Sequence, residues 1–165
     1  MGKKNGFTMI EIIFYLAIIA VLVFASFFVL NTINQSRLKN QIISEVDYQG
    51  MLISQTLAQE IRNAKSINLD NQNELILQSD NIEKNPIVFN VSDGNFYIKE
   101  GSQERIKLNN SRVSVASLQI KNNSVSEKYE SIKFSFVIAY TNKSGLPDYN
   151  YSKSFYGSAS TRQEK

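Results

Sequence analysis

The chain contains no histidine and no cysteine, and it has only two prolines in 165 residues. The absence of histidine and cysteine excludes Ser-His-Asp and Cys-His catalytic systems, thiolate or imidazole zinc sites, Cys-ligated clusters and disulfide bonds. It does not place the chain in the cytosol, because a protein of an oxidising compartment can fold without disulfides. Most common enzyme chemistries are therefore excluded, and the location has to be inferred from other features.

The charge of the chain is close to balanced. Lysine and arginine total 18 against 15 acidic residues, but Lys3 and Lys4 fall within the first six residues. Without these two lysines the balance is 16 basic against 15 acidic residues, which gives no electrostatic footprint for phosphate backbones. The charge therefore argues against a nucleic-acid partner. The length fits one compact domain with an appendage.

Residues 12–30 form a run of nineteen uncharged positions in which Ser26 is the only clearly polar residue. As a helix this run is roughly 28 Å long, which matches the hydrocarbon thickness of a bilayer. It is longer than the apolar region of a secretory signal peptide, and no convincing cleavage site follows it. A buried core helix usually keeps a polar face, so we predict a membrane span. The lysines before the run are nearly balanced by Arg37 and Lys39 after it, and the free N-terminus favours a cytoplasmic N-terminal side.

Glu11 is a single carboxylate at the start of this apolar run, between Ile10 and Ile12. A charge at the centre of a bilayer costs on the order of 2.5–3.5 kcal/mol on insertion scales, and less near the interface. The residue therefore indicates either a charged partner inside the membrane or an interfacial side chain that reaches headgroup water. The residues around it favour the first interpretation.

The six residues 6–11, GFTMIE, follow Lys3 and Lys4 and lead into the apolar run. Together they resemble the N-terminal signature of type IV prepilins and type II secretion pseudopilins. The resemblance implies that a prepilin peptidase cleaves after Gly6, that Phe7 becomes N-methylated, and that the apolar segment stays as the filament-forming helix. It also implies that Glu11, the fifth residue of the mature chain, pairs with the N-terminal amine of a neighbouring subunit. Pairing two buried charges would select one axial register during assembly.

The resemblance predicts a structural subunit, not an enzyme and without a cofactor, and specifically a minor subunit of a type IV pilus, competence pilus or type II secretion pseudopilus. The implied partners are other pilin or pseudopilin subunits, the prepilin peptidase and methyltransferase, an assembly platform protein with its ATPase, and membrane lipid before assembly. The implied location is a single-pass membrane protein with a cytoplasmic N-terminus and an extracytoplasmic head. The segments EIRNAKSI and FYGSASTR resemble minor J-type pseudopilins and related minor pilins. The chain departs from many pilins because no proline precedes Pro86, so the apolar helix lacks a proline kink.

An amphipathic stripe follows the apolar run. Apolar or small residues recur every three or four positions, at Ile42, Val46, Gly50, Ile53, Leu57, Ile61 and Ala64. Because no proline lies between Phe7 and Lys65, one helix of up to about 59 residues and roughly 88 Å is predicted. Gly50 on this stripe would permit either close packing of another element or a hinge, and we favour close packing.

From Ser66 the apolar periodicity shifts towards two. Strands are predicted at residues 74–78, 86–91, 95–100, 104–108, 111–121 and 131–140, and in the tyrosine-rich last segment. Turn signals between them indicate a meander-like antiparallel sheet. We therefore predict an α+β fold, a pilin-like lollipop in which a long N-terminal helix packs on an antiparallel β-sheet head. The expected parts are a leader (1–6), a membrane half (7–30) and an amphipathic half (31–65) of the helix, a β head (66–156) and a C-terminal tail (157–165).

Two groups of side chains leave open an alternative function, a pilus-tip module for DNA uptake or adhesion. The basic residues Arg105, Lys107 and Arg112 lie close together in the sequence. The aromatic residues Tyr149, Tyr151, Phe155 and Tyr156 would offer a surface for a partner if exposed. For these aromatics we favour sheet packing, with Tyr151 and Phe155 pointing inward.

Two acidic groups are candidates for a chemical site, one for calcium and one for acid–base catalysis. Residues 70–74, DNQNE, offer oxygen ligands for calcium but lack the twelve-residue loop pattern and its glycine, so a solvated turn is favoured and no metal site is predicted. Glu127 and Glu130 would suit acid–base catalysis without histidine, but they lie in a charged loop. If the helix served only as a membrane tether, Gly6 and Glu11 would be dispensable.

Overall fold

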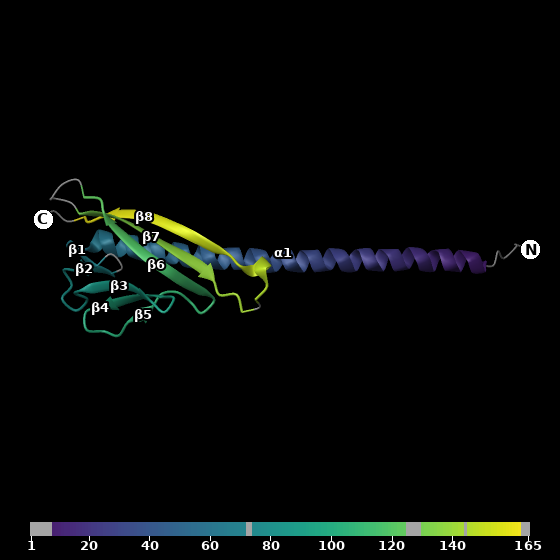
Figure 1. The fold of residues 1–165 in the computed structure, drawn as a ribbon, viewed down its shortest axis with the longest axis horizontal. Helices are drawn as coiled ribbons and strands as arrows, with labels where there is room; N and C mark the ends of the chain where they lie inside the picture. Colours follow the sequence, from purple (N-terminus) through teal and green to yellow (C-terminus); the bar gives the residue numbers. More distant parts are fainter. Residues whose placement is uncertain (1–7, 72–73, 125–129, 144, 163–165) are drawn as a thin grey trace, which may run out of the picture. The chain divides into compact units, whose positions relative to one another are not determined.

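The structure is a computed structural model that describes residues 8–71, 74–124, 130–143 and 145–162 (Figure 1). In chain order its elements are α1 (Met9–Asn63), β1 (Ser66–Asn71), β2 (Glu74–Gln78), β3 (Ile87–Ser92), β4 (Asn95–Glu100), β5 (Ile106–Lys107), β6 (Val113–Asn122), β7 (Ser131–Tyr140), the 3-10 turn η1 (Pro147–Tyr149) and β8 (Ser152–Ser160). The chain divides into two compact units, Met1–Asn40 and Gln41–Lys165, and α1 contributes residues to both. The predicted α+β class, with a long N-terminal helix packed against antiparallel sheets, is confirmed.

The strands form two antiparallel sheets, where the sequence analysis predicted one meander. One sheet has the order β1-β2-β3-β4-β5 and the other the order β6-β7-β8. The buried side chain of Asn109 lies at the break between them. Its Oδ1 accepts a hydrogen bond from the Phe96 N–H of β4 at 2.7 Å, and its Nδ2 donates to the Val113 carbonyl of β6 at 3.0 Å. The amide thus satisfies backbone groups of both sheets at the point where direct strand pairing ends.

Several strand limits differ from the prediction. Strands β2, β4 and β7 have the predicted bounds, but β5 keeps only two of the five residues predicted at 104–108. Strand β1 was not predicted, because the polar sequence SINLDN has weak β propensity and depends on its pairing with β2. Strand β8 continues through Ser160, four residues into the expected tail, because it pairs with β7 as far as Ser131.

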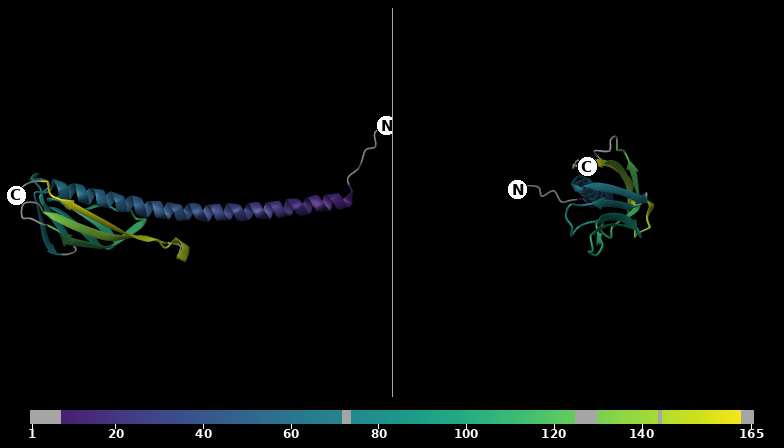
Figure 2. Two further views of the ribbon diagram at one scale, coloured as in Figure 1. Left: turned by 90° about the horizontal axis from the view of Figure 1, so that it is seen from above. Right: turned by 90° about the vertical axis from the view of Figure 1, so that its left-hand side faces the viewer.

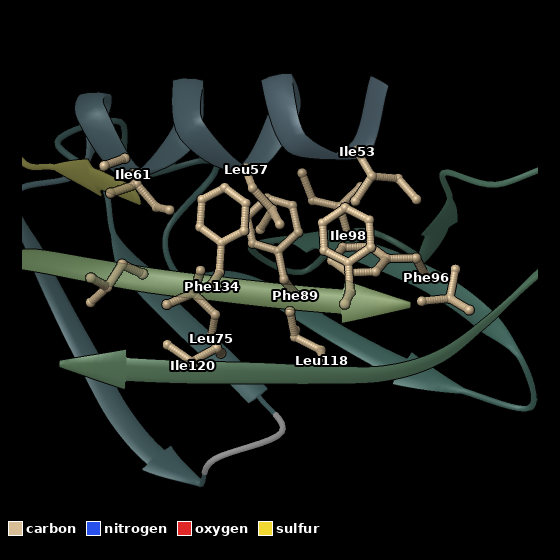
Figure 3. Close-up of a cluster of buried hydrophobic side chains, with 14 of the residues drawn as sticks. Ile53, Leu57, Ile61, Leu75, Phe89, Phe96, Ile98, Leu118, Ile120 and Phe134 are labelled. Atoms are coloured by element: carbon tan, nitrogen blue, oxygen red, sulfur yellow. The ribbon is translucent and has the colours of Figure 1, made fainter. Parts of the chain in front are cut away.

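The predicted stripe on the helix forms one side of the hydrophobic core (Figure 3). Ile53, Leu57 and Ile61 are fully buried on α1 and point towards aromatic and aliphatic side chains of both sheets. The sheets contribute the buried rings Phe89 and Phe96, among others. Each fully buried side chain of this kind stabilises the fold by about 1.5–3 kcal/mol. The amphipathic segment of α1 is therefore held by burial on the sheets.

At Gly50, a side chain of β8 packs closely against the α1 backbone. A β-carbon built on Gly50 would lie 2.0 Å from Cζ of the half-buried Phe155 ring, so the ring occupies the space that any other residue would need. Nearby, Lys153 Nζ donates a hydrogen bond to Asp47 Oδ1 at 2.8 Å, and this bond raises the pKa of Lys153. Figures 1 and 2 show β8 alongside this part of α1. The predicted role of Gly50 in close packing is confirmed.

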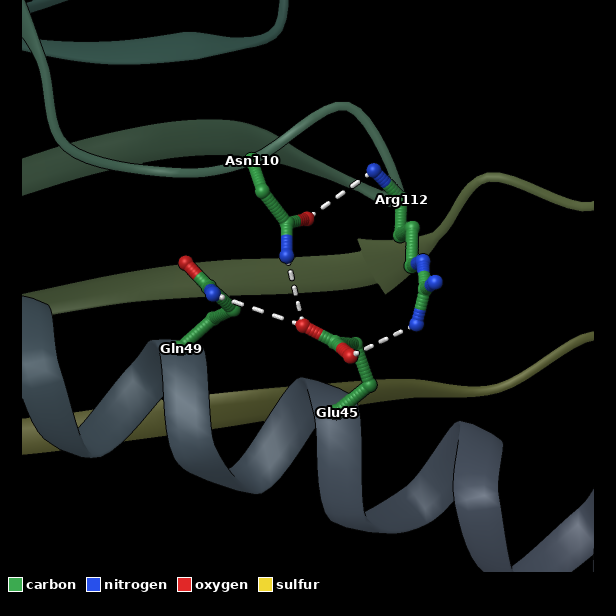
Figure 4. Close-up of polar contacts among 4 residues, drawn as sticks. All are labelled: Glu45, Gln49, Asn110 and Arg112. Atoms are coloured by element: carbon green, nitrogen blue, oxygen red, sulfur yellow. Dashed lines mark hydrogen bonds and ion pairs between the residues drawn. The ribbon is translucent and has the colours of Figure 1, made fainter.

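A polar cluster fixes the loop before β6 to the helix (Figure 4). The Glu45 carboxylate accepts hydrogen bonds from Asn110 Nδ2 at 2.6 Å and from Gln49 Nε2 at 3.4 Å. It also forms an ion pair with Arg112 Nη1 at 3.5 Å. The Arg112 backbone N–H donates in turn to Asn110 Oδ1 at 2.9 Å. One carboxylate on α1 thus positions the chain at the start of the second sheet.

The contact between Gly50 and Phe155 predicts an unusual sign for Gly50→Ala. Alanine in place of glycine inside a helix ordinarily stabilises by about 1 kcal/mol. Here we expect Gly50→Ala to lower the free energy of unfolding by about 1–3 kcal/mol, because the methyl group has to displace the ring. Denaturant unfolding of the detergent-solubilised chain, followed by circular dichroism, measures this change.

The matched control is Gly50→Ala made together with Phe155→Ala. Without the ring, the alanine at position 50 should be neutral or stabilising relative to Phe155→Ala alone. A stabilising effect of Gly50→Ala in the unaltered chain would contradict the close-packing account.

Candidate functional site

The N-terminal part of α1 carries an apolar surface that no other element covers among the described residues. From Met9 to Leu30 the large apolar side chains are 49% (Ile12) to 85% (Met9) exposed. We call residues 9–30 of α1 the N-terminal apolar surface. Such a surface needs lipid or protein around it, because its exposure to water is costly. The helix is long and apolar enough to cross a membrane, and it fits a single-pass membrane anchor.

The hydroxyl groups in and just after this segment are satisfied within the helix. Ser26 Oγ donates to the Leu22 carbonyl at 2.8 Å, and Thr32 Oγ1 donates to the Phe28 carbonyl at 3.0 Å. Hydrogen bonds to the carbonyl four residues earlier spare these groups from needing water. Both the apolar surface and its few polar groups therefore suit an environment without water.

Glu11 lies in the first turn of α1. Its backbone N–H donates to the Thr8 carbonyl at 3.1 Å, and its carboxylate is favourably placed at the positive end of the helix dipole. Tyr15 Oη donates to Glu11 Oε1 at 3.4 Å, a long hydrogen bond across one helical turn. In the part of the chain that the structure describes, no cation lies within ion-pair distance of Glu11.

The contact between Tyr15 and Glu11 is not among the features predicted from the sequence. The spacing of four residues was the available signal, because residues i and i+4 are neighbours on a helix surface. The other residues of the predicted processing site, Lys3, Lys4, Gly6 and Phe7, lie outside the described residues. Their assignment depends on the sequence.

Four of the basic and aromatic residues of the alternative function have contacts within the head. Arg112 pairs with Glu45, and the Arg105 guanidinium lies 5.4 Å from the centre of the Tyr97 ring. Tyr151 and Phe155 are partly buried against the core, which confirms the packing interpretation for these two, while Tyr156 is 79% exposed. The structure therefore does not combine these groups into one free basic and aromatic surface.

The acidic groups do not form a chemical site among the described residues. Glu130 Oε2 accepts a hydrogen bond from the Ile67 backbone N–H, which joins the start of β7 to β1. Glu127 and the side chains of residues 70–73 lie outside what the structure describes. Within the described ranges, no three acidic side chains come together in a way that could hold a metal ion. Glu130 thus makes a structural contact between two strands, and this contact engages the carboxylate that the acid–base hypothesis needs.

Residues 1–27 match the family model of the prokaryotic N-terminal methylation motif. The chain carries the type IV pilin and pseudopilin signature. No curated protein and no solved structure matches the chain with significance. The motif implies processing by prepilin peptidase and assembly with other pilins, and with the α+β fold it favours a structural subunit over an enzyme. It is shared by pilins and pseudopilins, so the resemblance to J-type minor pseudopilins stays a prediction.

Membrane anchoring by the N-terminal apolar surface can be tested with charges placed in its centre. We expect Ile19→Arg combined with Leu22→Arg to move the chain out of the membrane fraction, because the two arginines cost about 5–7 kcal/mol at the bilayer centre. Retention in the membrane pellet after alkaline carbonate extraction is the measurement. The control, Asn34→Arg combined with Ser36→Arg, adds the same charge beyond the apolar run and should stay in the pellet. Full retention of the first variant would contradict a membrane span.

Proposed function

We propose that the chain is the precursor of a minor structural subunit of a type IV pilus, competence pilus or type II secretion pseudopilus. The observation that carries this proposal is the methylation motif at residues 1–27, whose apolar part forms a helix that no other described element covers. Before assembly, lipid covers the N-terminal apolar surface. In the filament, the same surface packs against the helices of other subunits.

The processing site lies between Gly6 and Phe7. Lys3 and Lys4 stay with the free N-terminus on the cytoplasmic side, an orientation that the extra positive charge of the terminus favours, and the head lies on the other side of the membrane. Cleavage after Gly6 removes the lysines and leaves Phe7 with a new terminal amine, which the methyltransferase modifies. The mature N-terminus is then followed by an apolar helix whose first carboxylate is Glu11. Transfer to the filament requires the assembly platform protein and its ATPase.

Glu11 selects the axial position of each added subunit. A carboxylate without a cation in an apolar filament core is costly, and so is an ammonium group without an anion. Pairing Glu11 with the Phe7 amine of a neighbouring subunit removes both costs at one register only. The absence of a cationic partner for Glu11 among the described residues supports this role. The intramolecular contacts of Arg105 and Arg112 do not favour the alternative of a DNA-binding tip module.

Processing is tested by the mass of the N-terminal peptide from native membranes. We expect an N-methylated Phe7 terminus for the unaltered chain and an uncleaved leader for Gly6→Ala. The control Gly2→Ala changes the other leader glycine and should leave processing normal. An intact leader on the unaltered chain, in cells with an active prepilin peptidase, would rule out the proposed function.

The register role of Glu11 is tested by assembly of the processed subunit. We expect Glu11→Gln to be cleaved normally but to enter the sheared filament fraction at least about tenfold less, which corresponds to about 1.4 kcal/mol. The control Glu104→Gln removes an exposed carboxylate of the head and should assemble normally. Normal assembly of Glu11→Gln would leave α1 as a membrane anchor without a pairing role for its carboxylate.

A further inference from the structure

Strand β8 leaves a long backbone edge unpaired. The Tyr140 N–H donates to the Tyr151 carbonyl at 2.8 Å, and the Thr161 N–H donates to the Glu130 carbonyl at 2.9 Å. Because hydrogen-bonded pairs alternate along an antiparallel ladder, the odd-numbered residues of β8 bond to β7 and the even-numbered ones direct N–H and C=O outward. The outward set is Ser152, Ser154, Tyr156, Ser158 and Ser160. Within the described residues these outward groups have no hydrogen-bond partner.

Of the features that usually block strand addition, the β8 edge lacks a bulge, a proline and an unpaired charge, while α1 lies beside it. Exposed edges are commonly short, bulged, or protected by proline or charge. The edge strand β5 has two residues, and the edge strands β1 and β6 contain register irregularities. Strand β8 pairs without a bulge, contains no proline, and carries one charge, Lys153, which is bonded to Asp47. From Ser154 to Ser160 the open edge is roughly 20 Å long.

A groove runs beside the open edge, between β8 and α1. Met51, Ala58 and Arg62 line its helix side, and Gly157 and Ser158 line its strand side. A β-carbon on Gly157 would lie 2.3 Å from Cζ of Phe134, so the glycine lets this ring form an apolar floor. No carboxylate lines the groove within the described part of the chain. Alternate side chains of an added strand would enter this groove.

Two arginines lie at one end of the groove. The Arg162 N–H donates to the Arg62 carbonyl at 3.2 Å, which holds the end of β8 against the last turn of α1. Both residues are exposed, and both line a second hollow with Ser158 and Ser160, which shares Arg62 and Ser158 with the groove. Neither guanidinium forms an ion pair with another described residue. This end of the groove is therefore complementary to a carboxylate.

We propose that the β8 edge and its groove bind an acidic, extended segment of a partner subunit by strand addition. A row of backbone donors and acceptors is matched by another peptide backbone, and the arginines select carboxylates near one end of the added strand. A second copy of β8 does not meet this requirement, because its sequence SKSFYGSAS contains no acidic residue. The identity of the partner as a subunit of the same assembly rests on the proposed function, whereas the edge and groove do not depend on processing at Gly6.

The test uses the full chain in detergent micelles and a fluorescent synthetic peptide of about eight residues, alternating threonine and valine and ending in two glutamates. We expect the peptide to bind and to slow hydrogen exchange in the segment that contains Ser158 and Ser160. Two matched peptides, one ending in two lysines and one N-methylated at alternate valines, should each bind at least about tenfold more weakly. Ser158→Pro should also weaken binding about tenfold, while Ser158→Ala, which keeps the N–H, should not.

The charge requirement is tested with Arg62→Glu combined with Arg162→Glu. This variant should lose the preference for the glutamate peptide, while Lys99→Glu, on the other sheet, should keep it. No binding of the glutamate peptide, or equal binding of the N-methylated peptide, would overturn the proposal. Unaltered cleavage at Gly6 in the same variants separates a failure of this inference from a failure of the proposed function. Because the peptide controls leave the protein unchanged, the test does not depend on the folding of Ser158→Pro.

Discussion

The structure depends on the change in apolar patterning along one proline-free helix. From Met9 to Leu30 the apolar side chains surround α1, so this segment needs an apolar medium on every side. From Ile42 to Ile61 the buried side chains lie on one stripe, so this segment packs against a folded partner on one side. Both requirements are met by a helix that bonds its own backbone throughout, since a break would expose N–H and C=O groups in the apolar part.

The head is built around the stripe, and its polar contacts keep the two sheets in place. Asn109 satisfies backbone groups of β4 and β6, and Glu45 joins the loop before β6 to α1. Burial supplies most of the stabilisation, while these buried or half-buried polar groups determine where each sheet begins. The same contacts engage Arg112, one of the three basic residues of the alternative DNA-binding surface.

The division between anchoring and recognition follows from this arrangement. The N-terminal apolar surface presents apolar side chains and one carboxylate. These suit burial in a membrane first and then against like subunits in a filament. The β8 edge offers backbone groups and two arginines, which suit one particular strand of a partner. A structural subunit with both features would be held in the assembly by its helix and could contact a neighbour selectively through its head.

Local patterns in the sequence were sufficient to predict the long helix, to recognise the motif and to give the bounds of three strands. The apolar run, the stripe from Ile42 to Ile61 and the alternation in β2, β4 and β7 are properties of short segments, and the structure retains them. The split into two sheets, the weak strand β1, the full length of β8 and the ion pair of Glu45 with Arg112 were decided only by tertiary structure. Each depends on pairing between residues far apart in the chain, and neither propensity nor periodicity records which distant residue will satisfy a given backbone group or charge.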